Sequence, residues 1–272
     1  MSRLPSPAPA SSSVRVLGRR RAVVAALAAA LLAPLVAACG PGDGQQGSAS
    51  SRTELTVLAA SSLTDVFETA GKAYEKEHPG TRLRFSFAGS QELAAQVGQG
   101  APADALVTAD TTTMDGLKDE TGPSTVVARN RLVIVTGEGN PRKVRTLEDL
   151  ADPALKVVLA APEVPVGRYG RQILDAGGVE VKAVSQEPNV RAVLSKVGLG
   201  EADAGLVYRT DTATAAGKVD AVEIPDDRNA VASYPAAVLK ASKHGEEAAD
   251  FVSWLSTSEA QKIFREAGFQ QP

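Results

Sequence analysis

Two short loops of this chain place a serine and small neighbours where a predicted strand leads into a predicted helix. Ser62 ends the run Ala-Ala-Ser-Ser at 59–62, and Ser90 follows Phe-Ala-Gly at 87–89. The first backbone N–H groups of a helix have no intrahelical acceptor, and with the positive end of the helix dipole they can bind an anion. Small side chains would let that anion approach the backbone. The two loops therefore predict an anion site made of hydroxyls and main-chain amides.

Ser62 also has a simpler structural interpretation. The sequence Ser-Leu-Thr-Asp at 62–65 fits a capping box, with Ser62 as the N-cap and Asp65 at the third helical position. A serine there is in most cases only a structural cap. The anion hypothesis therefore depends on how many such loops the chain contains.

Two further loops precede helix-like segments. One is Val-Pro-Val-Gly-Arg-Tyr-Gly at 164–170, and the other is Glu-Pro-Asn-Val-Arg at 187–191, in which Asn189 can cap the following helix. Four helix starts in one chain could converge on a single anion. Arg168 and Arg171 lie near the third loop and could pair with the anion, but we favour a solvated surface role for both.

Strand-like runs alternate with segments of helical spacing from about Thr53 onward. The expected strands cover 54–58, 82–87, 105–108, 131–136, 157–160, 204–208, 219–224 and 235–239. Several are continuous apolar runs, as in strands covered on both faces. The alternation predicts an α/β fold with mainly parallel sheets flanked by helices. In such sheets ligands bind at the carboxyl ends of strands, where the loops above would lie.

The N-terminal segment has the pattern of an export signal. It holds five arginines and no acidic residue before an apolar stretch at 22–38, which is shorter than the roughly 20 residues of a spanning helix. Cys39 follows at once and is the only cysteine, so no intramolecular disulfide can form. Residues 36–39 resemble a bacterial lipobox. We predict a signal peptide at 1–38, a lipidated Cys39 and a flexible tether over 39–52.

Charge and composition argue against several other functions. Removal of 1–38 takes five arginines, so the net charge becomes 24 − 32 = −8, which argues against nucleic-acid binding. No G-x-S-x-G or S-x-x-K pattern surrounds Ser62, and His78 and His244 stand alone. We therefore expect no enzyme, no cofactor and no bare metal cation. A serine hydrolase and a lipoprotein that only presents a surface remain the weaker alternatives.

Several motifs follow one another in order along the chain. They are LTVLAASSLTD (55–65), FAGS (87–90), GAPADALVTAD (100–110), VPVGRYG (164–170), NVR (189–191), AGLVY (204–208) and YPAAV (234–238). With these motifs the chain resembles the periplasmic molybdate-binding proteins of ABC transporters, which are bacterial solute-binding lipoproteins. Two positions depart from that pattern: Ala161 stands before Pro162 where the family often has Asp, and Val166 stands where alanine is common.

The resemblance implies a fold and a site. The fold would be a two-lobed, type II-like periplasmic binding protein with two crossovers forming a hinge. Lobe 1 would comprise 53–130 plus 231–272, and lobe 2 would comprise 131–230. The anion would be bound by hydroxyl and N–H groups of two serines, by two valine amides and by a tyrosine hydroxyl; these residues are Ser62, Ser90, Val166, Val190 and Tyr208.

The resemblance also implies a function. The chain would bind molybdate and tungstate with high affinity in the cleft and deliver the anion to an ABC permease. We expect an exported monomer, anchored by its lipid to the outer face of the cell membrane. Because none of the five residues is charged or an acceptor carboxylate, a protonated oxyanion would leave a donor unpaired, at a cost of about 1 to 3 kcal/mol. Sulfate is fully deprotonated as well, so a sulfate binder remains the alternative.

Overall fold

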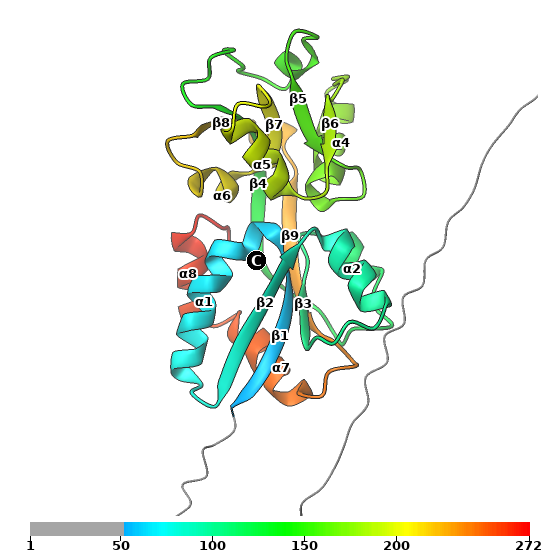
Figure 1. Ribbon diagram of the computed structural model, residues 1–272, viewed down its shortest axis with the longest axis vertical. Helices are drawn as coiled ribbons and strands as arrows, with labels where there is room; N and C mark the ends of the chain where they lie inside the picture. Colours follow the sequence, from blue (N-terminus) through cyan, green and yellow to red (C-terminus); the bar gives the residue numbers. More distant parts are fainter. Residues whose placement is uncertain (1–51) are drawn as a thin grey trace, which may run out of the picture. The chain divides into compact units, whose positions relative to one another are not determined.

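The strands of the first lobe surround β1 in a five-stranded sheet. We describe residues 52–272 in a computed structural model; the predicted signal peptide, Cys39 and nearly all of the predicted tether lie outside them. β1 (Thr53–Ala60) pairs in parallel with β2 (Thr81–Ala88) and β3 (Ala105–Val107). β9 (Val231–Val238) joins β3 antiparallel and also pairs with the first part of β4 (Thr125–Gly137). This sheet and its helices are called lobe 1 below (Figure 1).

The second lobe forms around the later part of β4. From Leu132 onward, β4 pairs antiparallel with β7 (Ala204–Tyr208) and β8 (Val219–Glu223). β7 lies parallel to β5 (Val157–Ala160), which is parallel to β6 (Ser185–Glu187). This sheet and its helices are called lobe 2.

Both lobes share β4, and β9 lies beside it where the chain passes between them (Figure 1). The predicted α/β, two-lobed fold is confirmed. Its sheets, however, are mixed where the sequence predicts mainly parallel ones, because β4 and β9 run antiparallel to their neighbours. An apolar run shows that a strand is buried but not which way it runs.

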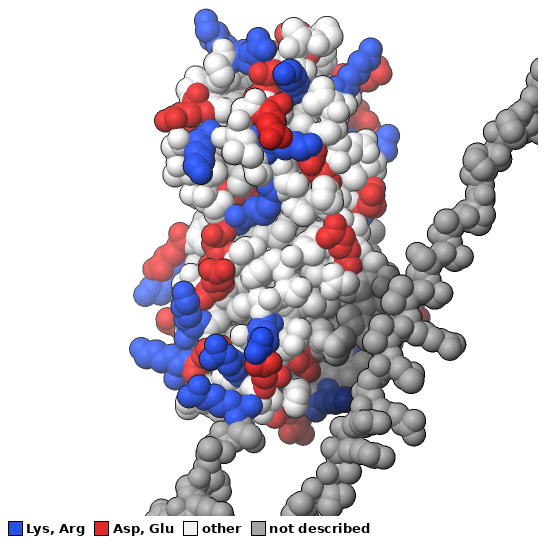
Figure 2. All heavy atoms as spheres, viewed as in Figure 1, with Lys and Arg blue, Asp and Glu red and all other residues white. Residues whose placement is uncertain are grey.

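Helices cover both sheets. They are α1 (Thr64–Glu77), α2 (Ser90–Gly98), α3 (Thr111–Asp115), α4 (Pro165–Ala176), α5 (Val190–Gly198), α6 (Arg209–Ala213), α7 (Gly245–Trp254) and α8 (Ser258–Glu266), with 3-10 turns at Ser61–Leu63, Glu148–Ala151 and Asp226–Arg228. Within 52–272, none of the helices combines the length and apolarity that crossing a bilayer requires. On the face drawn in Figure 2, Lys and Arg side chains are interspersed with Asp and Glu on both lobes.

An aromatic cluster fixes α1 on lobe 1. Phe67 and Tyr74 lie on the buried face of α1, seven residues apart, as the helical period requires. Phe67 meets Phe264 of α8 edge to face with ring centroids 6.1 Å apart, and Tyr74 meets Trp254 of α7 at 5.4 Å. Full burial of each such ring contributes about 1.5 to 3 kcal/mol. This packing holds the N-terminal end of α1 at the edge of the cleft.

Candidate functional site

A small cavity lies between the lobes and is lined by all five predicted site residues. Ser62 and Ser90 reach it from lobe 1, and Val166, Val190 and Tyr208 reach it from lobe 2. Each is at most 3% exposed. The cavity has a volume of about 10 Å³, roughly the room of one water molecule, whereas pockets for organic ligands measure about 300 to 1,000 Å³. The space is therefore far too small for an organic ligand of that size.

The capping box predicted at Ser62 is wrong. A 3-10 turn over Ser61–Leu63 delays the start of α1 to Thr64, and no side chain caps that helix. The Ser62 hydroxyl instead lies 3.1 Å from the Tyr234 hydroxyl of β9. Asp65 likewise does not cap the helix; its carboxylate binds Arg191.

A buried network orients the Ser62 hydroxyl. Asn130 Nδ2, which can only donate, lies 3.4 Å from the Tyr234 hydroxyl and 2.9 Å from Thr210 Oγ1. Asn130 Oδ1 accepts from the Arg131 N–H at 2.9 Å, which fixes the orientation of the amide. Tyr234 accepts from Asn130 and can donate its own proton to Ser62, although either hydroxyl can be the donor between them. When Tyr234 donates, the Ser62 proton is free for an acceptor in the cavity.

Burial keeps that tyrosine protonated. Desolvation raises the pKa of Tyr234 well above its usual range, and the nearby Asp211 carboxylate adds to the shift. Sequence reasoning missed Tyr234 and Asn130, because 104 and 172 positions separate the partners in this network. The only local sign of this network in the sequence was the tyrosine, with its polar hydroxyl, in the otherwise apolar run Tyr-Pro-Ala-Ala-Val.

Ser90 presents a donor in a similar way. It is the first residue of α2, as predicted, although Gly89 occupies the N-cap position. Its Oγ accepts from the Ala109 N–H at 3.0 Å, so the hydroxyl proton is left for another acceptor. A side chain at Gly89 would place its Cβ 2.5 Å from the Pro188 carbonyl oxygen of lobe 2. Glycine therefore permits the close approach of the two lobes beside Ser90.

The lobe 2 amides come from the first turns of α4 and α5. Pro165 opens α4, a position that suits proline, and Val166 follows. In α5 the Asn189 side chain accepts from the Ala192 N–H at 3.0 Å, which confirms the predicted cap. That cap does not use the N–H of Val190, the first residue of the helix. Both valines thus offer amides that helix geometry leaves without intrahelical partners.

Tyr208 ends β7 and supplies the remaining donor. Its hydroxyl is buried and has no hydrogen-bond partner among residues 52–272. Burial raises its pKa well above the usual value, so the hydroxyl carries a proton. An unpaired buried hydroxyl costs about 1 to 3 kcal/mol, which makes an acceptor at this place favourable.

Neither arginine near the third loop lines the small cavity. Arg168 donates from Nε to Asp110 at 2.8 Å, so the solvated role favoured for it is wrong. Arg171 Nε lies 3.9 Å from Asp175 Oδ2, and both side chains are largely exposed. Among the described residues, no charged side chain lines the small cavity, and no group of three or more His, Cys, Asp or Glu could hold a metal cation. The cavity thus presents neutral donors.

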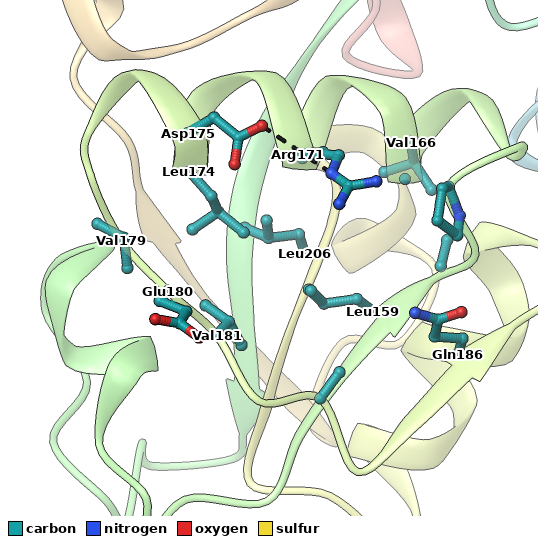
Figure 3. Close-up of a pocket in the computed structure, with 15 residues that line it drawn as sticks. Leu159, Val166, Arg171, Leu174, Asp175, Val179, Glu180, Val181, Gln186 and Leu206 are labelled. Carbon is teal, nitrogen blue, oxygen red and sulfur yellow. Dashed lines mark ion pairs between the residues drawn. The ribbon is translucent and has the colours of Figure 1, made fainter.

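A larger cavity of about 270 Å³ lies within lobe 2, beneath α4. Figure 3 shows Leu159, Leu174 and Leu206 at its apolar interior, with the Arg171–Asp175 pair above them. Val166 lines both cavities, but the other four predicted site residues are not part of the larger one. The larger cavity has charged residues in its lining, among them Arg171 and Glu180, but because it lacks four of the five predicted residues, the smaller cavity is the candidate site.

A buried carboxylate beside the site gives a pH-dependent prediction. Burial raises the pKa of Asp211 to about 6, because lost hydration outweighs the attraction of Arg191 2.8 Å away. The folded protein therefore holds this proton more tightly than the unfolded chain, and ionisation between about pH 4 and 6 costs stability, by about 3 kcal/mol. Relative to the parent, the unfolding free energy of Asp211→Asn should rise by that amount from pH 4 to pH 7. Urea unfolding measures it, and a constant difference would contradict the assignment.

Comparison with known proteins identifies the family of the chain. The molybdate-binding protein ModA of Mycobacterium tuberculosis is 39% identical over 252 residues, which cover 90% of this chain and 97% of that protein. The putative ABC transporter substrate-binding lipoprotein YvgL of Bacillus subtilis is 34% identical over 255 residues, covering 90% and 96%. The periplasmic molybdate-binding protein of Azotobacter vinelandii shares the fold, with a TM-score of 0.70 at 22% identity over 80% of this chain and 99% of that one. The family resemblance drawn from the motifs is confirmed. Residues 55–270 match the family described as bacterial extracellular solute-binding protein, and the chain belongs to it.

Proposed function

We propose that this protein binds molybdate, and tungstate in the same way, between its lobes and delivers it to the permease of an ABC transporter. One observation carries the proposal: five neutral donor residues from two lobes line one small cavity. The names of the relatives support molybdate as the ligand. The Ser62, Ser90 and Tyr208 hydroxyls and the Val166 and Val190 amides would hold the four oxygens. No cofactor takes part.

The proposed mechanism is closure around the anion. Lobe 1 would consist of 53–130 plus 231–272 and lobe 2 of 131–230, joined by the two crossings at β4 and β9. Since donors come from both lobes, the anion stabilises the closed arrangement relative to an open one. The closed site excludes water, and each hydrogen bond is stronger at low local dielectric. Export, lipidation of Cys39 and anchoring to the outer face of the membrane would keep the monomer near its permease.

Specificity would follow from the donors. Because the cavity lining offers protons and lacks an acceptor carboxylate, hydrogen phosphate would bring a donor without a partner. Sulfate carries the same charge as molybdate, so the protein must distinguish the two anions by their fit to the size of the cavity. A sulfate binder would use the same mechanism and remains the second candidate.

Calorimetry tests the ligand assignment. We expect the mature protein to bind molybdate and tungstate tightly, sulfate much more weakly and phosphate little, with little change between pH 6.5 and 8. Sulfate affinity equal to that of molybdate would overturn the ligand assignment and leave the mechanism. Failure to bind any of the four anions would overturn the function and favour a surface role.

Removal of either serine hydroxyl tests the site itself. Ser62→Ala and Ser90→Ala should each weaken molybdate binding by about 1 to 3 kcal/mol, because each removes one donor to a buried anion. The exposed Ser253 of α7 provides a control, and Ser253→Ala should bind like the parent. Unchanged affinity in both site variants, measured by the same calorimetry, would place the site elsewhere.

A further inference from the structure

Two arginines next to the proposed site reach from lobe 2 to carboxylates of lobe 1. Arg168, in α4, donates from Nε to Asp110 Oδ2 at 2.8 Å, and its Nη2 donates to the same carboxylate and to Thr113 Oγ1 at 2.7 Å. Arg191, the second residue of α5, donates from Nη2 to Asp65 Oδ2 at 2.6 Å. Each arginine thus lies within two residues of Val166 or Val190, on the same helix.

We propose that these pairs are closing contacts, which form when the lobes close over the anion and slow its release without touching it. The inference rests on the proposed function, since it concerns how long the bound anion is retained. The arginines are positioning residues: they hold α4 and α5, and with them the two valine amides, against lobe 1.

Both arginines are already paired with carboxylates and other protein acceptors. Arg168 is held by Asp110, by Thr113 and by the Glu163 carbonyl oxygen. Arg191 is held by Asp65 and by Thr214, and its Nε lies 2.8 Å from Asp211 Oδ1. Neither arginine belongs to the lining of the small cavity. Their charges are therefore compensated by carboxylates, and the anion is left to the neutral donors.

The two pairs differ in strength. The Asp110 side chain is 4% exposed, whereas that of Asp65 is 59% exposed. Asp110 is also fixed as the N-cap of α3, where Oδ1 accepts from the Thr113 N–H at 3.0 Å. A preorganised pair with a buried carboxylate contributes more to a contact than a pair whose carboxylate is exposed, because water and salt screen the exposed charge. Arg168–Asp110 is therefore the main contact, and Arg191–Asp65 a minor one.

Release of radiolabelled molybdate, chased with unlabelled molybdate, separates this role from direct binding. Arg168→Gln and Asp110→Asn should each speed release about tenfold or more and leave the association rate unchanged, because the pair is absent while the lobes are open. Asparagine keeps the α3 cap. The double variant should release no faster than the more affected single variant, since both remove one contact. Asp65→Asn should change release less than about threefold.

The Arg171–Asp175 pair is a matched control. It lies on α4 as well, but both side chains are about 70% exposed and belong to one lobe (Figure 3). Arg171→Gln with Asp175→Asn should release molybdate at the parental rate. Circular dichroism checks that each variant folds, and Asp110→Asn decides alone if Arg168→Gln does not fold.

Three results would overturn the inference. Unchanged release in Asp110→Asn would show that the pair does not retain the anion. Slower release in Asp110→Asn with faster release in Arg168→Gln would mean that Arg168 binds molybdate directly. If the parent binds no molybdate, the proposed function fails first, and the inference falls with it.

Discussion

Replacing Val190 by proline should weaken molybdate binding by about 1.5 to 3 kcal/mol, because it removes one amide donor to a charged oxygen. The substitution suits the local backbone. Val190 is the first residue of α5, where proline is favoured, and Asn189 before it is extended, with φ −160° and ψ 168°. Proline at this position therefore removes the amide N–H without requiring a change in the backbone before it.

Val190→Ala is the matched control for this variant. It keeps the amide N–H and shortens the same buried side chain, so it accounts for the packing that proline also changes. We expect Val190→Ala to bind molybdate much more tightly than Val190→Pro in calorimetry, while the two unfold in urea at similar free energies. Equal affinities of the two variants would show that this amide does not hold the anion.

Tyr208→Phe should lower affinity and leave the stability of the ligand-free protein nearly unchanged. The hydroxyl is buried without a partner among the described residues only while the lobes are closed; in the open, ligand-free protein, water can bond to it. The same change deletes a donor to the anion, and molybdate affinity should fall by about 1.5 to 3 kcal/mol. Urea unfolding without ligand and calorimetry with molybdate measure the two effects.

Tyr234, which packs beside Tyr208, provides a comparison variant. Its ring lies 5.9 Å from that of Tyr208, but its hydroxyl is bonded to Ser62 and Asn130. Tyr234→Phe should therefore destabilise the ligand-free protein by about 1 kcal/mol, because buried partners lose a hydrogen bond. A loss of stability in both variants would mean that the Tyr208 hydroxyl has a favourable partner in the ligand-free protein.

Local sequence patterns were sufficient for most of the strands. The apolar runs at 157–160 and 204–208 predict β5 and β7 to the residue, because strands buried on both faces leave an uninterrupted apolar signal. β6, with the sequence Ser-Gln-Glu, was missed, since three polar residues carry no periodicity. Its position follows only from pairing with β5.

The site was predictable where function leaves a local pattern, and unpredictable where it depends on distant pairs. Small residues before a helix start predicted Ser62 and Ser90 as site residues. The family resemblance carried by the motifs predicted Val166, Val190 and Tyr208. The orientation of the Ser62 hydroxyl depends on Tyr234, 172 positions away, and the state of Arg168 depends on Asp110, 58 positions away. Such pairs form through the tertiary fold, and no local spacing reports them.

The central claim is that neutral donors from both lobes surround the anion. The most direct test is a crystal structure of the mature protein with molybdate, in which anomalous scattering locates the molybdenum. We predict one peak in the small cavity, with oxygens within hydrogen-bond distance of the Ser62, Ser90 and Tyr208 hydroxyls and of the Val166 and Val190 amides. A molybdenum peak held by Arg168 or Arg191, or lying in the larger cavity beneath α4, would contradict the account.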